Sequence, residues 1–182
     1  GGIAGENAQR VNITGSAEVD DRRLLLDLDG RLGARDRVAL LVDAEPDGDD
    51  FDLALDASAA ADGPIAALAG LDAPLDMRVR GDGTWTQWDG ALLVRSEDER
   101  VAALQLTNRA GRFGLLGTVD PTVFLTGLPA EALGDKVALK GDIAIDNRVF
   151  DGMAIVAGRK VSLSAEGLVD LADNRADDLE MV

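Results

Sequence analysis

The chain has 182 residues, of which 46% are hydrophobic and 3% aromatic, and its formal net charge is −16. The hydrophobic content is sufficient for a folded core and too high for a disordered acidic tail. The negative charge opposes binding to nucleic acid and to anionic lipid head groups, so we expect no nucleic-acid partner. The absence of Cys and His excludes disulfides, Cys nucleophiles, Ser-His-Asp triads and nearly all zinc sites.

The two ends of the sequence show no targeting segment. The first residues, GGIAGENAQR, lack the basic and apolar regions of a signal peptide, and no apolar run is long enough to span a membrane. The last residues, NRADDLEMV, stop within an alternating stretch. We therefore expect the chain to be an internal segment of a longer protein.

Apolar and polar residues alternate through most of the sequence, which predicts β-strands with one apolar and one solvated face. The predicted strands, in chain order, cover 9–19, 23–32, 37–44, 50–60, 74–83, 87–95, 100–108, 112–119, 136–146, 148–158, 160–170 and 174–182. The connections between them are short and rich in turn residues, which favours antiparallel hairpins. Two breaks interrupt the pattern, and they predict a short helix over 64–70, which begins at Pro64, and a helical turn at 129–133.

The segments 80–94 and 140–156 resemble each other. Each contains a basic residue, Gly-Asp, an aromatic residue, Asp-Gly and an apolar run, and the two Asp-Gly pairs begin 62 residues apart, at Asp89 and Asp151. This spacing indicates a repeat of about five strands plus a crossing segment. We interpret residues 1–182 as one continuous β segment with candidate repeat units 1–62, 63–134 and 135–182, the last of them truncated.

About twelve strands with one apolar face cannot remain flat in water, because large exposed apolar surfaces are rare and an open sheet of this size curls or splits. The apolar faces contain many small residues, such as Gly81, Gly90, Gly141 and Ala165. Small residues leave space between Leu and Val side chains, and glycines allow a sheet to bend. This composition favours a strongly curved sheet with an aliphatic interior, and a closed sandwich with a tightly packed core is the alternative.

The segments 13–30, 63–83 and 167–182, with Asp-rich strands that contain few aromatic residues and with Asp-Gly turns, resemble the β segments of the TamB family. This family of inner-membrane components of the translocation and assembly module is related to AsmA-like proteins and to bridge-like lipid transfer proteins. The resemblance covers essentially the whole chain, and it is a resemblance of composition and strand pattern and not of an invariant motif.

The resemblance implies an all-β fold: a strongly curved, mostly antiparallel sheet that forms an open U-shaped groove, the β-taco, with one or two short helical connections. It implies a periplasmic location in an inner-membrane-anchored protein and transfer of phospholipid toward the outer membrane, or assistance to outer-membrane protein assembly. The implied partners are phospholipid acyl chains, adjoining segments of the same chain and, for the full-length protein, an outer-membrane barrel. No cofactor is expected.

The residues expected to contact lipid lie on the apolar faces of the predicted strands. They are Val11, Ile13, Leu24, Leu26, Leu28, Val38, Leu40, Val42, Phe51, Leu53, Leu55, Val79, Leu139, Ile143, Val161, Leu163 and Val169. We expect Leu163 to lie between the strands at 148–158 and 174–182. A scaffold that pairs its edge strands with unfolded outer-membrane proteins is the alternative function.

Other motifs indicate chemistry only weakly. The stretch 43–54 imitates a calcium-binding loop, but Ala54 stands where the bidentate Glu is needed and Pro46 interrupts it, so we interpret it as a hairpin turn. The Gly-Asp-Gly at 81–83 lacks the third glycine and the helix of a dinucleotide-binding loop. Trp85 and Trp88 could stack on a sugar or a base, but such a pair more often covers a core or the rim of a groove. With 34 acidic residues, adjacent carboxylates arise by chance, and an enzyme is the least favoured class.

Overall fold

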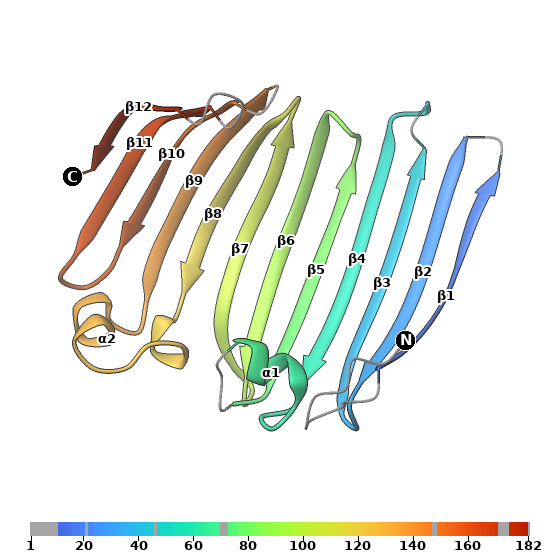
Figure 1. Ribbon diagram of the computed structural model, residues 1–182, viewed down its shortest axis with the longest axis horizontal. Helices are drawn as coiled ribbons and strands as arrows, with labels where there is room; N and C mark the ends of the chain where they lie inside the picture. Colours follow the sequence, from blue (N-terminus) through green and yellow to red (C-terminus); the bar gives the residue numbers. More distant parts are fainter. Residues whose placement is uncertain are drawn as a thin grey trace.

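The computed structural model describes residues 11–20, 22–45, 47–69, 73–146, 149–170 and 175–181. Its twelve strands form one antiparallel sheet in which the spatial order follows the chain from β1 to β12 (Figure 1). The strands are β1 (Val11–Asp20), β2 (Arg23–Leu32), β3 (Asp36–Glu45), β4 (Asp50–Ala59), β5 (Leu75–Gly83), β6 (Gln87–Ser96), β7 (Glu99–Arg109), β8 (Arg112–Val119), β9 (Val137–Asp146), β10 (Val149–Ala157), β11 (Ser162–Asp170) and β12 (Arg175–Met181).

The predicted secondary structure is confirmed for the described residues, with strand ends that differ by at most two positions. The predicted strand ends at 9–10, 148, 174 and 182, and the predicted helix end at 70, lie outside the described residues. Helix α1 (Pro64–Ala69) begins at the predicted proline, and α2 (Leu128–Leu133) includes the predicted helical turn. The 3₁₀ helix η1 (Pro121–Val123) was not predicted, although the Asp120 carboxylate caps it by accepting a hydrogen bond from the Thr122 N–H.

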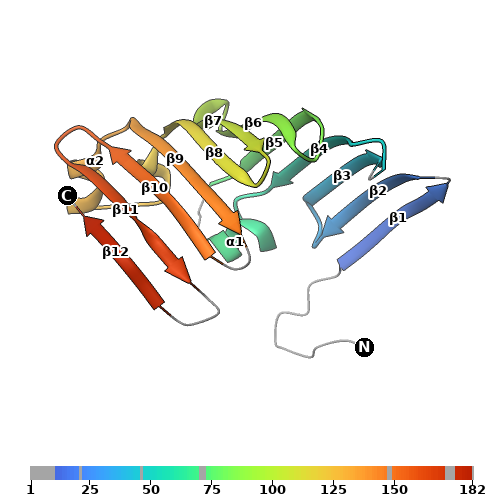
Figure 2. The ribbon, with the colours of Figure 1, turned by 90° about the horizontal axis from the view of Figure 1, so that it is seen from above.

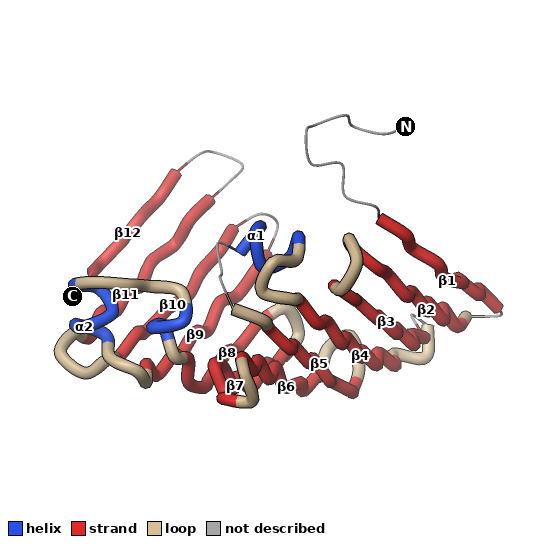
Figure 3. The backbone as a smooth tube through the Cα atoms, turned by 90° about the horizontal axis from the view of Figure 1, so that it is seen from below, coloured by secondary structure: helices blue, strands red, loops and turns tan. Residues whose placement is uncertain are grey.

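The sheet is strongly curved, and Figures 2 and 3 show that β1 and β12 form its two separate edges while α1 lies on its concave side. The strands belong to a single sheet that does not close on itself. The alternative of a closed sandwich is therefore wrong.

The register places the alternating apolar residues on one face throughout the sheet. The row of cross-strand neighbours at the middle of this face is Ala17, Leu26, Val42, Leu53, Gly81, Gly90, Leu106, Leu115, Gly141, Ala154 and Ala165. Ala59, which belongs to the same face, packs against Ala66 of α1. Since α1 lies on the concave side, the apolar face is the concave one.

We call the end of the concave face near α1, η1 and α2 the helical end. Its row of strand residues is Val38, Ala57, Met77, Val94, Ala102, Val119 and Val137. Ala102 and Val137 are buried, and Val123 of η1 packs against the cluster formed by Ala59 and Ala66. The helical connections therefore cover part of the apolar face that the strands alone would leave exposed.

A buried carboxylate attaches α1 to the sheet. Asp36, the first residue of β3, is 1% exposed and accepts hydrogen bonds of 2.8 Å from the backbone N–H groups of Ala60 and Ile65. These bonds satisfy donors in the connection from β4 and in the first turn of α1, where no intrahelical acceptor is available. The absence of a side chain at Gly63 leaves space for this carboxylate. Asp36 thus has a structural role.

The helical segments divide the strands into three groups of four. Asp89 lies in β6 and Asp151 in β10, so the 62-residue interval spans four strands, and the repeat of about five strands was wrong. The two similar segments form corresponding hairpins, β5–β6 after α1 and β9–β10 after α2. The division into units 1–62, 63–134 and 135–182 stays a prediction.

Candidate functional site

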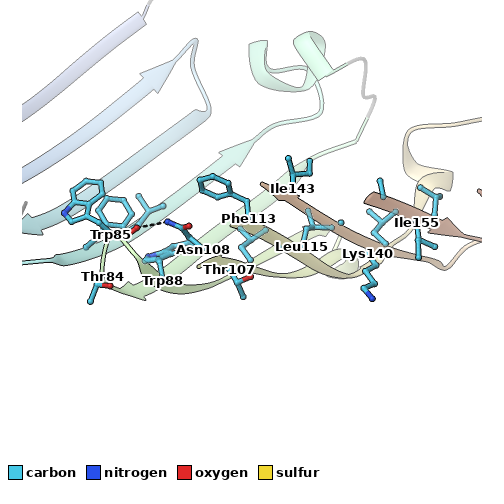
Figure 4. A pocket seen from close by; sticks show the side chains of 18 residues that line it. Thr84, Trp85, Trp88, Thr107, Asn108, Phe113, Leu115, Lys140, Ile143 and Ile155 are labelled. Atoms are coloured by element: carbon cyan, nitrogen blue, oxygen red, sulfur yellow. Dashed lines mark hydrogen bonds between the residues drawn. The ribbon is translucent and has the colours of Figure 1, made fainter. Parts of the chain in front are cut away.

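The concave face contains a cavity of about 770 Å³ that extends from β4 to β10 (Figure 4). Its volume is in the range of ~300–1,000 Å³ that is typical of small-molecule sites. The residues that line it are mainly apolar: Phe51, Leu53, Thr84, Trp85, Trp88, Leu106, Thr107, Asn108, Phe113, Gly114, Leu115, Leu139, Lys140, Gly141, Ile143, Ala154, Ile155 and Val156.

Three aromatic side chains gather at one side of this cavity. The ring of Phe51 lies 4.5 Å from the ring of Trp85 and 6.2 Å from that of Trp88, measured between centroids. Trp88 is in β6, whereas Trp85 is in the connection between β5 and β6 and remains 42% exposed. The interpretation of the two tryptophans as a cover for a core or the rim of a groove agrees with this position. We call this side of the concave face the aromatic end.

The glycines beside Trp88 explain how its indole fits against the sheet. A Cβ atom at Gly81 or Gly90 would collide with the indole ring. We expected small residues to leave free space above the sheet, and at these two positions that expectation was wrong because Trp88 fills the space. At Gly141, in contrast, a Cβ atom would meet only Leu115 Cβ, at 3.8 Å.

Asn108 fixes the connection that carries Trp85. Its amide nitrogen donates a hydrogen bond of 2.7 Å to the Trp85 carbonyl (Figure 4). Its amide oxygen accepts one of 3.0 Å from the Gly111 N–H. Asn108 is also the cross-strand neighbour of both Trp88 and Phe113. This single side chain therefore holds two turns in place and brings one polar group to the aromatic end.

The concave face is otherwise free of charge near the cavity. The row at the aromatic end is Val19, Leu24, Ala44, Phe51, Trp88, Asn108, Phe113, Ile143, Gly152 and Gly167. A further row lies between the middle row and the row at the helical end: Gly15, Leu28, Leu40, Leu55, Val79, Leu92, Leu104, Gly117, Leu139, Val156 and Leu163. With the middle row and the row at the helical end, these described residues include one polar side chain, Asn108, and no charged one. Lys140 belongs to the opposite face and points away from the cavity.

Charged residues concentrate on the convex face, where they form ion pairs across the strands. Asp56 of β4 contacts the guanidinium groups of Arg78 and Arg80 of β5. The hydrogen bond from Arg80, with a smaller one from Arg78, lowers the pKa of the Asp56 carboxyl below its usual range. In the same way, the hydrogen bond from Arg23 lowers the pKa of Asp43. These contacts are exposed, so they favour solubility and strand register more than they add stability.

The expected lipid-contacting residues follow one face but do not all reach the cavity. Phe51, Leu53, Leu139 and Ile143 line it. Val161 precedes β11, and the side chain of Val169 lies outside the described part of the structure. Strand β11 pairs with β10 and β12 as expected, and Leu163 is opposite Val156. The others occupy the same face beyond the cavity: Val11, Ile13, Leu24, Leu26, Leu28, Val38, Leu40, Val42, Leu55 and Val79.

Several cavity residues were absent from that set. Leu106 and Phe113 follow polar residues within predicted strands, so the same periodicity could have identified them, whereas Leu115 and Val156 stand beside the apolar residues Leu116 and Ile155 and are less clearly marked. Asn108 gives no comparable signal, because its importance depends on two turns that only the folded chain brings together.

The acidic motifs have structural explanations. In the β3–β4 hairpin Asp43 pairs with Asp52 and Glu45 with Asp50, so the hairpin predicted over 43–54 is confirmed for its described residues. Within the described residues, no group of three or more acidic, His or Cys side chains is arranged to hold a metal ion.

Comparisons with family models, curated protein sequences and solved structures find no match to this chain. No helix in the described part of the chain has the length and apolar character needed to cross a membrane.

Proposed function

We propose that this chain is a segment of a periplasmic bridge of the TamB type, which carries phospholipid from the inner to the outer membrane along a hydrophobic β-groove. In this proposal the curved sheet is the wall of an open U-shaped groove, and the concave face contacts the acyl chains. The observation that supports it best is the set of four adjacent apolar rows without a charged side chain.

Burial of an acyl chain against such a face is favourable by about 0.8 kcal/mol for each CH₂ group removed from water. It requires no specific polar contact. Because successive strands are ~4.8 Å apart and present similar apolar residues, a chain that moves by one strand exchanges one apolar neighbour for another. The face therefore suits a ligand that must move along it.

A matched pair of neighbouring residues in β8 tests this function. Leu115 lines the cavity, whereas Leu116 is 54% exposed on the convex face. Native mass spectrometry of the protein purified from bacterial cells should detect bound phospholipid. The lipid should be lost in Leu115→Arg, where the charge interrupts the apolar face, and retained in Leu116→Arg. Wild-type protein that is folded and repeatedly free of lipid, or equal lipid capture by both variants, would contradict the proposal.

A scaffold that assists outer-membrane protein assembly is the second candidate, and the edge strand β1 favours it. All ten residues of β1 are exposed, and in the described structure β1 pairs only with β2. A free edge of this kind can accept a further strand. Photocrosslinkers at Leu53 and Leu139 should capture lipid if the groove functions, whereas crosslinkers at Val11 and Ile13 should capture protein if the edge functions. We propose no catalytic role and no cofactor.

A further inference from the structure

The indole N–H of Trp88 is buried and meets no hydrogen-bond acceptor within the described part of the chain. Buried donors of folded proteins are nearly always paired, and an unpaired one is unfavourable. The indole cannot easily turn toward another acceptor, because it occupies the space above Gly81 and Gly90. A ligand that brings an acceptor atom to this N–H would therefore gain a hydrogen bond that the free protein does not make.

Trp85 is the most accessible of the three aromatic side chains that gather on this side of the cavity. It is in a connection and not in a strand, its side chain is 42% exposed, and it stacks on Phe51. Asn108 holds its backbone carbonyl, so a change at this position is a rotation of the side chain. Trp85 lines the cavity together with Phe51 and Trp88, so a rotation of its side chain would change the access of a cavity ligand to this side.

The electrostatics of the cavity limit the acceptor to an uncharged one. The apolar rows beside Trp88 contain no cation, and Lys140 points to the opposite face. A carboxylate or phosphate at Trp88 would lose its hydration without gaining a counter-charge. An ester carbonyl is neutral, is a good acceptor, and is attached directly to an acyl chain.

We propose that Trp88, with Phe51 and Trp85, forms a subsite for the ester carbonyl of an acylglycerol lipid. The acyl chain then lies in the cavity, and the charged head group remains outside at the aromatic end. This inference rests on the proposed lipid-carrying function, and it adds the position and the chemistry at which a lipid is held.

The test compares two lipids that differ only at the carbonyl. Dioleoyl phosphatidylcholine and its dioleyl ether analogue have the same head group and chain length, but the ether has no carbonyl acceptor. In competition from mixed vesicles, with the bound fraction measured by native mass spectrometry, the wild-type chain should prefer the ester by about five- to tenfold, the range expected for one neutral hydrogen bond. Trp88→Phe, which keeps an aromatic ring but removes the N–H, should bind both equally. Leu116→Ala, on the exposed convex face and outside the cavity, is the control and should retain the ester preference.

Each outcome is decisive for the subsite. Equal binding of ester and ether by the wild-type chain, or an ester preference that persists in Trp88→Phe, would overturn it. If both lipids bind without preference, the subsite proposal is refuted, but the proposed lipid-carrying function is not. If neither lipid binds, both the subsite and the proposed lipid-carrying function are refuted. The wild-type comparison needs no variant, so it holds even if Trp88→Phe does not fold.

Discussion

The two ends of the concave face are built from the same alternating strands, yet their side chains differ in solvent exposure. At the helical end Val137 is 3% exposed, whereas Phe113 at the aromatic end is 44% exposed. The difference arises from the connections, because α1, η1 and α2 all lie at one end of the strands and only short turns lie at the other. Strand alternation thus selects the apolar face, and connection length decides which part of it is covered.

A charge at the helical end should have the largest effect on stability. Val137→Asp places a carboxylate in a buried apolar position without a partner, and we expect a loss of about 3–5 kcal/mol in the free energy of unfolding. The matched variant is Leu163→Asp, on the same face but 56% exposed, which should cost less than about 1 kcal/mol while it reduces lipid capture. Urea denaturation measures the first effect and native mass spectrometry the second. Equal destabilisation by the two variants would contradict the difference in cover between these two positions of the apolar face.

Removal of the carboxylate that holds α1 should be the next largest effect. Asp36→Ala leaves the N–H groups of Ala60 and Ile65 without their acceptor and should cost about 2–3 kcal/mol. Asp36→Asn keeps one acceptor oxygen and should cost less. Urea denaturation together with limited proteolysis of the connection at 60–69 would test this order. A stability of Asp36→Ala equal to that of the wild type would mean that α1 does not depend on this carboxylate.

A smaller effect is expected where glycines make room for Trp88 at the aromatic end. Gly81→Ala should displace the indole and cost about 1–3 kcal/mol, because its Cβ collides with the ring. Gly141→Ala, at the corresponding position of the similar segment, meets only Leu115 Cβ at 3.8 Å and should change stability by less than about 1 kcal/mol. Near-ultraviolet circular dichroism should change in the first variant only. A comparable spectral change in Gly141→Ala would contradict the assignment of this space to Trp88.

The smallest effect concerns the ion pairs of the convex face. The pKa of Asp56 is lower in the folded chain than in the unfolded one, where it is about 3.9, so its contribution to stability is present above pH ~4 and is lost as the pH falls through the folded pKa. The Asp56 side chain is 45% exposed, and solvent screening limits the contribution to a few tenths of a kcal/mol. Wild type and Asp56→Asn should therefore differ slightly at pH 7 and converge as the pH falls through the lowered folded pKa in denaturant titrations. A difference that grows on acidification would contradict this sign.

The strands could be predicted from the sequence because period-two alternation has a direct physical cause, the burial of one face. Pro64 likewise indicated the start of α1, since proline fits the first helical turn. The attachment of α1 by Asp36 could not be predicted, because it joins residues 24 and 29 positions apart in the sequence. The same reason applies to Asn108, which contacts Trp85 across 23 residues. The position of Trp88 above Gly81 and Gly90 also requires the register, which alternation alone does not specify.

The pairing of every strand with its immediate sequence neighbours has a consequence for folding. Each hairpin can form from a short stretch of chain, so folding can begin at several places and extend strand by strand, with a smaller entropic cost of loop closure than in a sheet with crossovers. Stability should then behave as a sum of local and nearest-neighbour terms, as in repeat proteins. Insertion or deletion of a four-strand group with its helical connection would leave the pairing of all other strands unchanged. A chain of this topology can therefore change in length during evolution without redesign of the strands that remain.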